Sequence, residues 1–353
     1  MFFFQIYDTF KPMPRIRIDA TAKLNLHLSI GERRSDGFHD IESLFLALAY
    51  GDTLSFEIPS QESAFSSEDT EIILDWQLPW GRSEDLSPGK NIVNQAVSLF
   101  RQHTGFDKRL KVVIEKRIPL GGGLGGGSSD AAAALLALNR LASPEGLVSD
   151  AVLVEMGASL GSDVPFFLQI SPNDTHSIAW VSGRGEQIRP FVPPPQVQNL
   201  SLVLVNPGFP SDTAKAFRLL DEMRGNEQQA PLASLRSSVP KATLSPPQSL
   251  IPILSGSPQD WPFSNDFLPV FEADFKRKKA DNGSFPAYSE IIDVLRELGA
   301  DFSGLSGSGS TCFGVFSNQS KARTARGLLL KRWNFVIETF LLAFRNIQWY
   351  NIE

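Results

Sequence analysis

Apolar and polar residues alternate over residues 15–30, near the start of the chain. Ile16 and Ile18 are followed by alanine or an aliphatic residue at every second position up to Ile30. Because successive side chains of a β-strand point to opposite faces, this spacing predicts a half-buried strand, or two strands joined by a kink. The opposite face of the predicted strand carries four polar residues, Asp19, Lys23, Asn25 and His27.

Other apolar segments predict further elements along the chain. Short apolar runs predict strands at 41–50, 110–118, 201–205 and 312–316. Apolar residues at helical spacing predict helices at 91–102, 128–141, 149–160, 288–298 and 320–333. The chain therefore mixes strands with helices.

Two long segments show no sustained period. Residues 60–88 are polar and irregular, and residues 225–260 are rich in proline, serine and glutamine. We interpret the second segment as an inserted loop. Four prolines between positions 190 and 198 predict a linker. A chain of 353 residues is long enough for two domains, which we place at 1–189 and 190–353.

Composition narrows the class of protein. A hydrophobic content of 42% and a charged content of 20% are typical of a globular protein. The net charge of −6 gives no electrostatic reason to expect nucleic acid or an anionic membrane as the main partner. No apolar run approaches the roughly 20 residues that span a bilayer, and the first residues lack the basic region of a signal peptide. We expect a soluble, cytoplasmic protein.

Cysteine and histidine are too scarce for two common kinds of site. Cys312 is the only cysteine, so no intrachain disulfide can form, and there are four histidines in all. No Cys/His metal cluster can be built from this set. We therefore predict no metal site made by the protein alone.

The segment 119–130 carries the strongest chemical signal. It contains six glycines within seven positions, followed by Ser128, Ser129 and Asp130, between a predicted strand and a predicted helix. Glycines let successive backbone amides face one concavity, and a helix N-terminus adds positive potential, so the segment predicts a phosphate-binding loop. The three polar residues are good N-cap candidates, and either serine hydroxyl could instead face a phosphate or its Mg²⁺.

Other interpretations of this loop are weaker. It lacks the Gly-Lys-Ser/Thr ending of a Walker A loop. A dinucleotide fingerprint matches almost automatically in so glycine-dense a run, and its expected acidic residue should end a second strand, whereas Asp150 stands at a helix start. A flexible linker would not be bracketed by a strand and a capped helix.

Two further constellations are ambiguous when taken alone. Lys23 and Asn25 on one strand face could simply be solvated surface. Asp163 follows a helix stop and precedes an apolar run, where an acid often caps a turn. Each gains weight only from its place beside the other motifs.

Together the three segments resemble the GHMP kinase superfamily. The glycine loop is similar to that family's second motif, Ala-Lys-Leu-Asn-Leu at 22–26 to its first, and Leu-Ser-Gly-Ser-Gly at 305–309 to its third. The resemblance covers most of the chain, from about residue 18 to residue 316. It implies an α+β fold of two domains, an N-terminal one like ribosomal protein S5 domain 2 and a GHMP kinase C-terminal one. It also implies an enzyme that uses ATP with Mg²⁺.

The resemblance carries roles to individual residues. Asp163, in Gly-Ser-Asp-Val-Pro, matches the catalytic base that takes the proton of the attacking hydroxyl, and Lys23 would keep that carboxylate ionised and orient the nucleophile. Asn91 matches a position that contacts adenine. The implied phosphate-binding residues are Gly121, Gly122, Gly123, Leu124, Gly125, Gly126, Gly127, Ser128 and Ser129.

The substrate end is implied by a shorter motif. Asp-Gly-Phe-His at 36–39 is similar to the Asp-Gly-Tyr-His of one branch of the superfamily, whose substrate carries a cytidine diphosphate group. Phe38 stands where tyrosine is usual, which keeps stacking but removes a hydroxyl. His39 could instead be an ordinary loop histidine, and Phe217, placed as a second aromatic wall, could be core. The implied substrate-binding residues are Asn25, Phe38, His39, Phe217, Gly307 and Ser308.

Some questions stay open at the level of sequence. Another GHMP kinase, of the homoserine or mevalonate type, or a GHMP-fold binding protein without turnover, is the alternative function. The chain is expected to be a monomer or a homodimer. Asn265 and Asp266, in Phe-Ser-Asn-Asp, also match the family, without a role that the sequence assigns.

Overall fold

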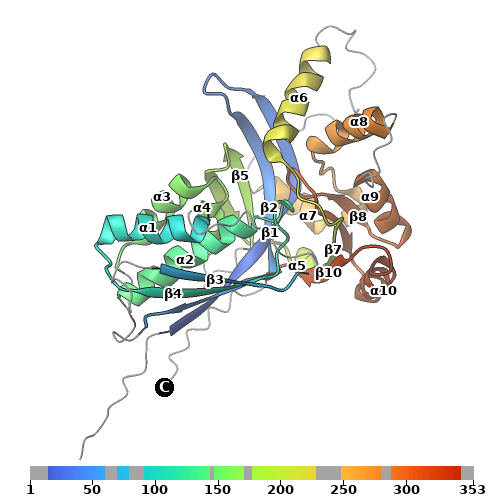
Figure 1. Cartoon of the computed structure of the whole chain (residues 1–353). Coiled ribbons are helices and arrows are strands. Elements are labelled where there is room, and N and C mark those ends of the chain that lie inside the picture. The colour runs from blue at the N-terminus through green and yellow to red at the C-terminus, as the bar shows by residue number, and fades with distance from the viewer. Residues whose placement is uncertain are drawn as a thin grey trace, which may run out of the picture.

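The computed structural model describes residues 15–59, 70–78, 91–143, 147–170, 177–227, 248–279 and 288–342. Its strands form a six-stranded and a four-stranded sheet, and helices pack against both (Figure 1). The mixture of helix and sheet agrees with the predicted α+β class. Within the described residues, no helix has the length and apolar character needed to cross a membrane.

The six-stranded sheet is built around one long hairpin. β1 (Arg15–Arg33) pairs antiparallel with β2 (His39–Glu57) along most of its length. The first half of β2 also pairs with β5, and its second half with β4, so β2 is the central strand. β3 pairs with β4 in parallel, and β6 closes the other edge beside β5. The remaining strands of this sheet are β3 (Thr70–Trp76), β4 (Leu110–Lys116), β5 (Ile178–Gly183) and β6 (Gln187–Phe191).

The strand β1 departs from the predicted half-buried pattern. Both of its faces are covered near the middle, so Lys23, Asn25 and His27 are only 5%, 3% and 8% exposed. Its register against β2 shifts between Thr21 and Lys23 and again between Asn25 and His27. The second shift separates His27, which packs against aromatic rings, from the other two polar residues.

The apolar residues of β1 serve three different cores. Ile18 and Ala20 pack under the helices of the first sheet, Leu24 packs between the two sheets, and Ile30 joins the core of the second sheet. The first register shift of the hairpin follows the pairing of Thr21 with Gly51, where a side chain would come within 2.2 Å of the Ala20 oxygen. The strand thus connects the two halves of the molecule.

Four helices cover one face of the first sheet (Figure 1). They are α1 (Ile92–Thr104), α2 (Gly126–Ala142), α3 (Asp150–Leu160) and α4 (Val164–Gln169). The predicted helix at 128–141 begins two residues earlier, after Gly125, whose φ of 70° ends the glycine loop. The prediction that Ser128, Ser129 and Asp130 cap this helix is therefore wrong, because the helix begins at Gly126 and all three lie inside it.

The four-stranded sheet is antiparallel throughout. Its order is β10 (Phe335–Phe340), β7 (Ser201–Asn206), β9 (Cys312–Phe316) and β8 (Phe302–Leu305). The two sheets meet where Leu342 N donates to Ala47 O of β2 over 2.9 Å. The helices of this half include α6 (Thr213–Glu227), α7 (Leu250–Ser255), α8 (Phe267–Lys279), α9 (Tyr288–Glu297) and α10 (Gln319–Leu329).

Several elements were not predicted. β3 lies inside the segment taken as irregular, and α7 and a 3₁₀ turn (Pro258–Asp260) lie inside the segment taken as a loop. The rest of those two segments falls outside the described residues. A short helix, α5 (Pro195–Gln198), occupies the proposed linker. The change from the first sheet to the second falls between β6 and β7, and the domain division at residue 190 stays a prediction.

Candidate active site

The glycine loop is packed tightly by the protein itself. Gly121, Gly123 and Gly125 have φ values of 60°, 74° and 70°, which favour glycine. A side chain on Gly123 would come within 2.1 Å of the Ser306 oxygen, and one on Gly125 within 2.8 Å of Lys23 Cγ. The sequence explained these glycines by the approach of a ligand, but several serve the approach of other segments of the chain.

The open part of the loop lies at the start of α2. Gly127 is exposed, and a side chain there would meet only Ile92, at 3.7 Å. Ser128 is half-buried, with its hydroxyl about 3.9 Å from where a side chain on Gly161 would lie. The first amides of a helix have no acceptor within the helix, so they can bind an anion here. Ser129 is buried, and its backbone N–H donates to Gly125 O.

Lys23 and Asp163 face each other beside this helix start. Lys23 Nζ lies 3.6 Å from Asp163 Oδ2, and the Asp163 side chain is 26% exposed against 6% for Lys23. Asp163 stands at the start of α4, but its carboxylate makes no capping hydrogen bond. The interpretation of this acid as a mere cap is therefore wrong. A backbone hydrogen bond of 2.9 Å from Lys23 N to Leu124 O ties the pair to the glycine loop.

The environment of Lys23 opposes its charge. Burial lowers the pKa of Lys23, and the nearby Asp163 carboxylate offsets only part of that effect. The ammonium also lies 4.6 Å from the centre of the Phe45 ring. A ligand that brings further negative charge close to this ammonium would favour its charged form.

Asn25 connects Lys23 to the third motif. Its Oδ1 accepts a hydrogen bond from Lys23 Nζ, and its Nδ2 donates to Ser43 Oγ over 2.9 Å. Its backbone N–H donates to Ser306 Oγ over 3.2 Å, and that hydroxyl donates to Gly123 O over 2.8 Å. One serine therefore joins the first motif to the second.

The predicted residues of the third motif lie beside these groups. A side chain on Gly307 would come within 3.2 Å of Asn25 Oδ1, and its φ of 56° is also unfavourable for other residues. Ser308 Oγ lies 2.8 Å from Thr213 Oγ1, and Ser308 O accepts from Ser211 Oγ. The loop that precedes α6 thus closes over the third motif.

The motif at 36–39 lies at the tip of the long hairpin. Phe38 is 55% exposed, and the Arg184 guanidinium lies 4.9 Å from the centre of its ring. His39 is buried, stacks on Phe217 with ring centres 5.1 Å apart, and has Nε2 3.3 Å from Asp221 Oδ1. The structure therefore brings His39 and Phe217 together, as parts of the hairpin and of α6.

Arg184 escaped the sequence analysis. It lies in the turn between β5 and β6, next to Gly185, where a side chain would come within 3.1 Å of Ser162. The turn thus connects Phe38 with the neighbour of Asp163. No local sequence pattern indicates this arginine, because its contact with Phe38 depends on the tertiary position of the turn.

A buried charge cluster lies beneath the glycine loop. Lys116 Nζ pairs with Asp52 Oδ2 and, over 2.6 Å, with Asp130 Oδ2. Asp52 Oδ1 also accepts two backbone hydrogen bonds, from Arg117 N and Ile118 N, just before the loop. Burial raises the pKa of Asp130 to about 7, and the Asp52 charge adds to that rise although Lys116 opposes it. This cluster holds β2, β4 and α2 together.

The predicted adenine ligand has a structural contact of its own. Asn91 is buried at the start of α1, where its Oδ1 accepts from Val93 N over 2.9 Å. A groove of about 350 Å³ begins one turn further along α1 and runs toward the end of α3. It is lined by Asn94, Gln95, Ser98, Leu99, Gln102, Ser159 and Leu160.

The chain matches two family models and many curated proteins. Residues 91–169 match the GHMP kinases N terminal domain, and residues 273–333 match GHMP kinases C terminal. The 4-diphosphocytidyl-2-C-methyl-D-erythritol kinase of Thermodesulfovibrio yellowstonii is 34% identical over 322 residues, which cover 91% of this chain and 97% of the relative. The enzyme of the same name from Anaeromyxobacter dehalogenans is 36% identical over 310 residues, covering 87% and 82%.

Solved structures agree with these matches. A crystal structure of 4-(cytidine 5'-diphospho)-2C-methyl-D-erythritol kinase aligns with a TM-score of 0.63 and 28% identity, over 92% of this chain and 99% of that one. The Methanococcus jannaschii mevalonate kinase aligns with a TM-score of 0.59 at 14% identity, over 94% and 99%. The second likeness shows the shared fold alone.

Proposed function

The chain belongs to the GHMP kinases, and within that family we propose that it phosphorylates the 2-hydroxyl of 4-diphosphocytidyl-2-C-methyl-D-erythritol with ATP, a step of the non-mevalonate route to isoprenoid precursors. The observation that carries the proposal is the Lys23–Asp163 pair of 3.6 Å beside the open N-terminus of α2. An acceptor for a proton and a cradle for phosphates lie next to each other there. These are the two functions that phosphoryl transfer needs from a protein.

Asp163 is the proposed general base. Its carboxylate is partly exposed and free of capping bonds, so a substrate hydroxyl can reach it. Lys23 Nζ lies 3.6 Å from the carboxylate and places a positive charge beside the attacking hydroxyl. In the reaction the hydroxyl oxygen forms a bond to the γ-phosphorus, its proton passes to Asp163, and the bond from phosphorus to the leaving ADP oxygen breaks.

The start of α2 is the proposed phosphate site. The amides near Gly127 and Ser128 are accessible and lie at the positive end of the helix. Among the described residues no three acidic, histidine or cysteine side chains gather into a metal site. Mg²⁺ carried by ATP does not need a protein cluster of that kind, because it takes most of its ligands from phosphates and water. Ser128 would hold it, and the ion would supply charge neutralisation on the phosphates.

The hairpin tip and α6 form the proposed cytidine end. Phe38 offers an exposed ring for stacking, and the stacked pair of His39 and Phe217 lies on the adjoining elements. Arg184 lies between Phe38 and the neighbour of Asp163, where a cation suits the diphosphate that links the two ends of the substrate. We propose Asn91, at the start of α1, for contact with adenine.

Substrate choice is tested by comparing turnover of the three candidate alcohols in separate assays. Purified protein is given ATP with the cytidyl alcohol, with homoserine or with mevalonate, and ADP release is measured. We expect turnover with the cytidyl alcohol alone. Turnover only with homoserine or mevalonate would replace the specific assignment, and no turnover with any of them would favour a binding protein of this fold. Asp163→Asn is the matched control for contaminating kinases.

A further inference from the structure

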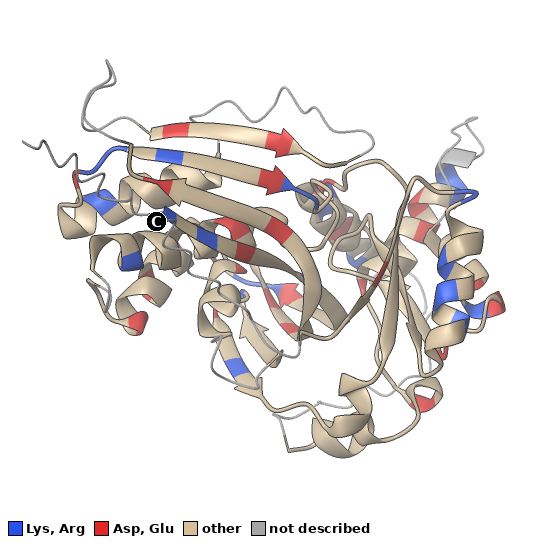
Figure 2. Ribbon diagram, turned by 90° about the horizontal axis from the view of Figure 1, so that it is seen from below, with Lys and Arg blue, Asp and Glu red and all other residues tan. Residues whose placement is uncertain are grey.

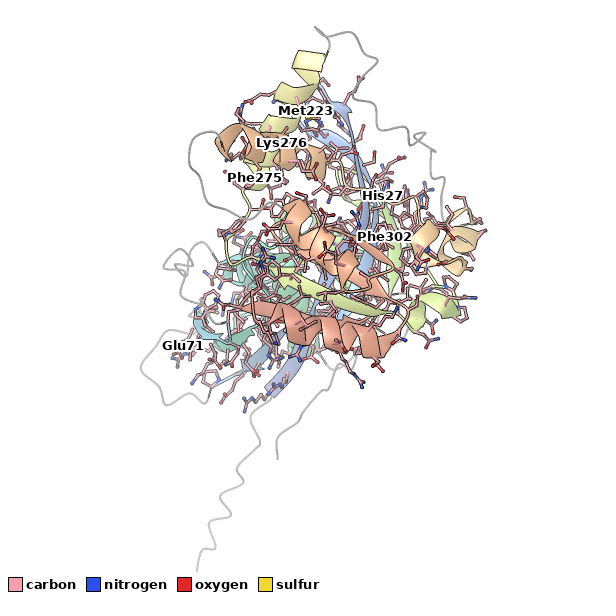
Figure 3. All side chains as sticks on the ribbon, turned by 90° about the vertical axis from the view of Figure 1, so that its right-hand side faces the viewer. His27, Glu71, Met223, Phe275, Lys276 and Phe302 are labelled. Atoms are coloured by element: carbon pink, nitrogen blue, oxygen red, sulfur yellow. The ribbon has the colours of Figure 1, made fainter. Side chains whose placement is uncertain are left out.

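The segment Ser264–Asn265–Asp266 contacts the strand that carries the candidate catalytic lysine. Leu28 N donates to Ser264 O over 2.8 Å, and Asp266 N donates to Leu28 O over 3.0 Å. The segment thus adds a short parallel bridge to β1. The side chain of His27, the neighbour of Leu28, also contacts the segment, because its Nδ1 accepts from Ser264 N over 3.2 Å (Figure 3 labels His27).

The side chain of Asn265 reaches away from β1 to the third motif. Its Nδ2 donates to Leu305 O over 2.7 Å and to Gly307 O over 2.8 Å. Its Oδ1 accepts from Phe267 N over 2.9 Å, at the start of α8. Both amide hydrogens and the amide oxygen are therefore used, and only an amide supplies this set of donors and acceptor.

The carbonyl that Asn265 holds belongs to a glycine in contact with the site. Gly307 packs against the Asn25 side chain, whose Oδ1 accepts a hydrogen bond from Lys23 Nζ. Lys23 in turn faces Asp163 at 3.6 Å. A continuous series of contacts therefore leads from Asn265 to the candidate base.

The same loop is also held by contacts that do not involve Asn265. Ser306 Oγ donates to Gly123 O, and Thr311 N donates to Gly122 O over 3.1 Å. These contacts fix the loop to the phosphate-binding segment. Asn265 adds two separate hydrogen bonds to the loop, at Leu305 O and Gly307 O, so loss of the Asn265 donors leaves the contacts of Ser306 and Thr311 in place.

Asp266 extends the same connection to α6. Its Oδ2 accepts from Ile30 N over 2.8 Å and lies 3.7 Å from Arg224 Nη2. Arg224 also donates to the backbone oxygens of Ile30 and Gly31, both over 2.7 Å. Figure 3 shows Met223 of α6 near Lys276 of α8, the helix that follows the segment. One short segment therefore joins β1, the third motif and the helix of Phe217.

We propose that Asn265 is a positioning residue for the phosphate-accepting substrate, because it sets the loop of Gly307 and Ser308 against the strand of Lys23 and Asn25. The inference rests on the proposed function for the identity of that substrate. The hydrogen bonds from Asn265 to Leu305 O and Gly307 O, which we call the brace, are a property of the free protein. The brace and the proposed function can therefore be tested apart.

Asn265→Asp isolates the brace from the helix start. The carboxylate keeps an acceptor for Phe267 N but has no hydrogen to donate, so two carbonyl oxygens face it unpaired. Loss of two hydrogen bonds predicts a fall of about ten-fold or more in kcat/KM for the cytidyl alcohol. The KM for ATP is expected to stay within about two-fold, because the phosphate side stays anchored.

Asn318→Asp is the matched control. Asn318 caps α10 by accepting from Lys321 N over 3.1 Å, and it is exposed and makes no contact with the site. The same change of amide to carboxylate there is expected to leave both kinetic constants unchanged. If Asn265→Asp does not fold, Asn265→Ser, which keeps a short acceptor, is used for the same measurements.

Hydrogen exchange of the free protein provides a readout that needs no substrate. We expect faster exchange of the amides at 305–309 in Asn265→Asp than in Asn318→Asp. Equal exchange, or a rise in the KM for ATP that matches the loss for the alcohol, overturns the proposal. If the wild-type protein does not phosphorylate the cytidyl alcohol, the proposed function fails, and the exchange result alone decides whether the brace exists.

Discussion

Two buried lysines lie on either side of the glycine loop, and they differ in what surrounds them. Lys23 faces the single carboxylate of Asp163, which is 26% exposed. Lys116 faces two carboxylates, those of Asp52 and Asp130, which are 0% and 6% exposed. The first pair is partly accessible through Asp163, and the second cluster is closed by the protein.

The pKa values of the two lysines move in opposite directions. Burial lowers the pKa of Lys23 more than Asp163 raises it. Burial opposes the charge of Lys116 as well, but the two carboxylates outweigh it, so the pKa of Lys116 rises. A buried lysine beside an acid is therefore no mark of an active site. What distinguishes the candidate site is a counter-charge that is incomplete and accessible.

Removing the accessible carboxylate has the largest expected effect. Asp163→Asn keeps the shape of the side chain but removes the proton acceptor, so kcat should fall by about a thousand-fold. The dissociation constant of ATP, measured by calorimetry, should change little because the phosphate site is intact. A kcat near the wild-type value would remove Asp163 from the role of base.

Breaking the closed cluster should act on stability instead. Lys116→Met leaves two buried carboxylates without their cation, and we expect the free energy of unfolding to fall by about 3–5 kcal/mol. Denaturant unfolding of the variant and the wild-type protein measures the difference. A loss below about 1 kcal/mol would show that the cluster does not stabilise the start of the loop.

The same change at the other lysine should have the opposite profile. Lys23→Met replaces a desolvated cation by an apolar side chain of similar length, so the free energy of unfolding should change by no more than about 1 kcal/mol. Turnover should fall by about a hundred-fold, because Asp163 loses its charge partner. Similar stability losses in both methionine variants would contradict the distinction between the two lysines.

The last expected effect is a dependence of the unfolding free energy on pH. The pKa of Asp130 in the folded protein is raised to about 7, above its value in the unfolded chain. Its contribution to stability is therefore complete at low pH and is lost as the pH rises through about 7. Asp130→Asn should flatten the fall in unfolding free energy between about pH 4 and pH 8. An unchanged slope in the variant would assign the dependence to other groups.

Much of the secondary structure was predictable because it depends on local periodicity. The helix expected at 91–102 is α1, and the strand expected at 312–316 is β9. Two helices were not predicted: α6, which ends at the start of the predicted loop, and α8, which follows it. Pro269 stands in the first turn of α8, where proline is tolerated, although it commonly signals a break.

Membership of the GHMP kinases, predicted from three motifs, is confirmed by the family models and the curated relatives. The burial of β1 on both faces was not predictable from its alternation. That alternation describes one strand with one solvated face, whereas β1 passes between two halves of the molecule. The cytoplasmic location and the oligomeric state stay predictions.

The sequence by itself determined the glycine loop, the order of the three motifs and the family, because these features are contiguous and rest on local backbone freedom. Only the tertiary structure decided which acids pair with Lys116. Asp52 reaches Lys116 across 64 residues, and Asn265 reaches Gly307 across 42. Such partners are chosen by packing of distant segments, which leaves no periodic signal in the chain. For the same reason the phosphate-binding chemistry of the loop could be predicted from the sequence, whereas the hydrogen bonds of Asn265 could not.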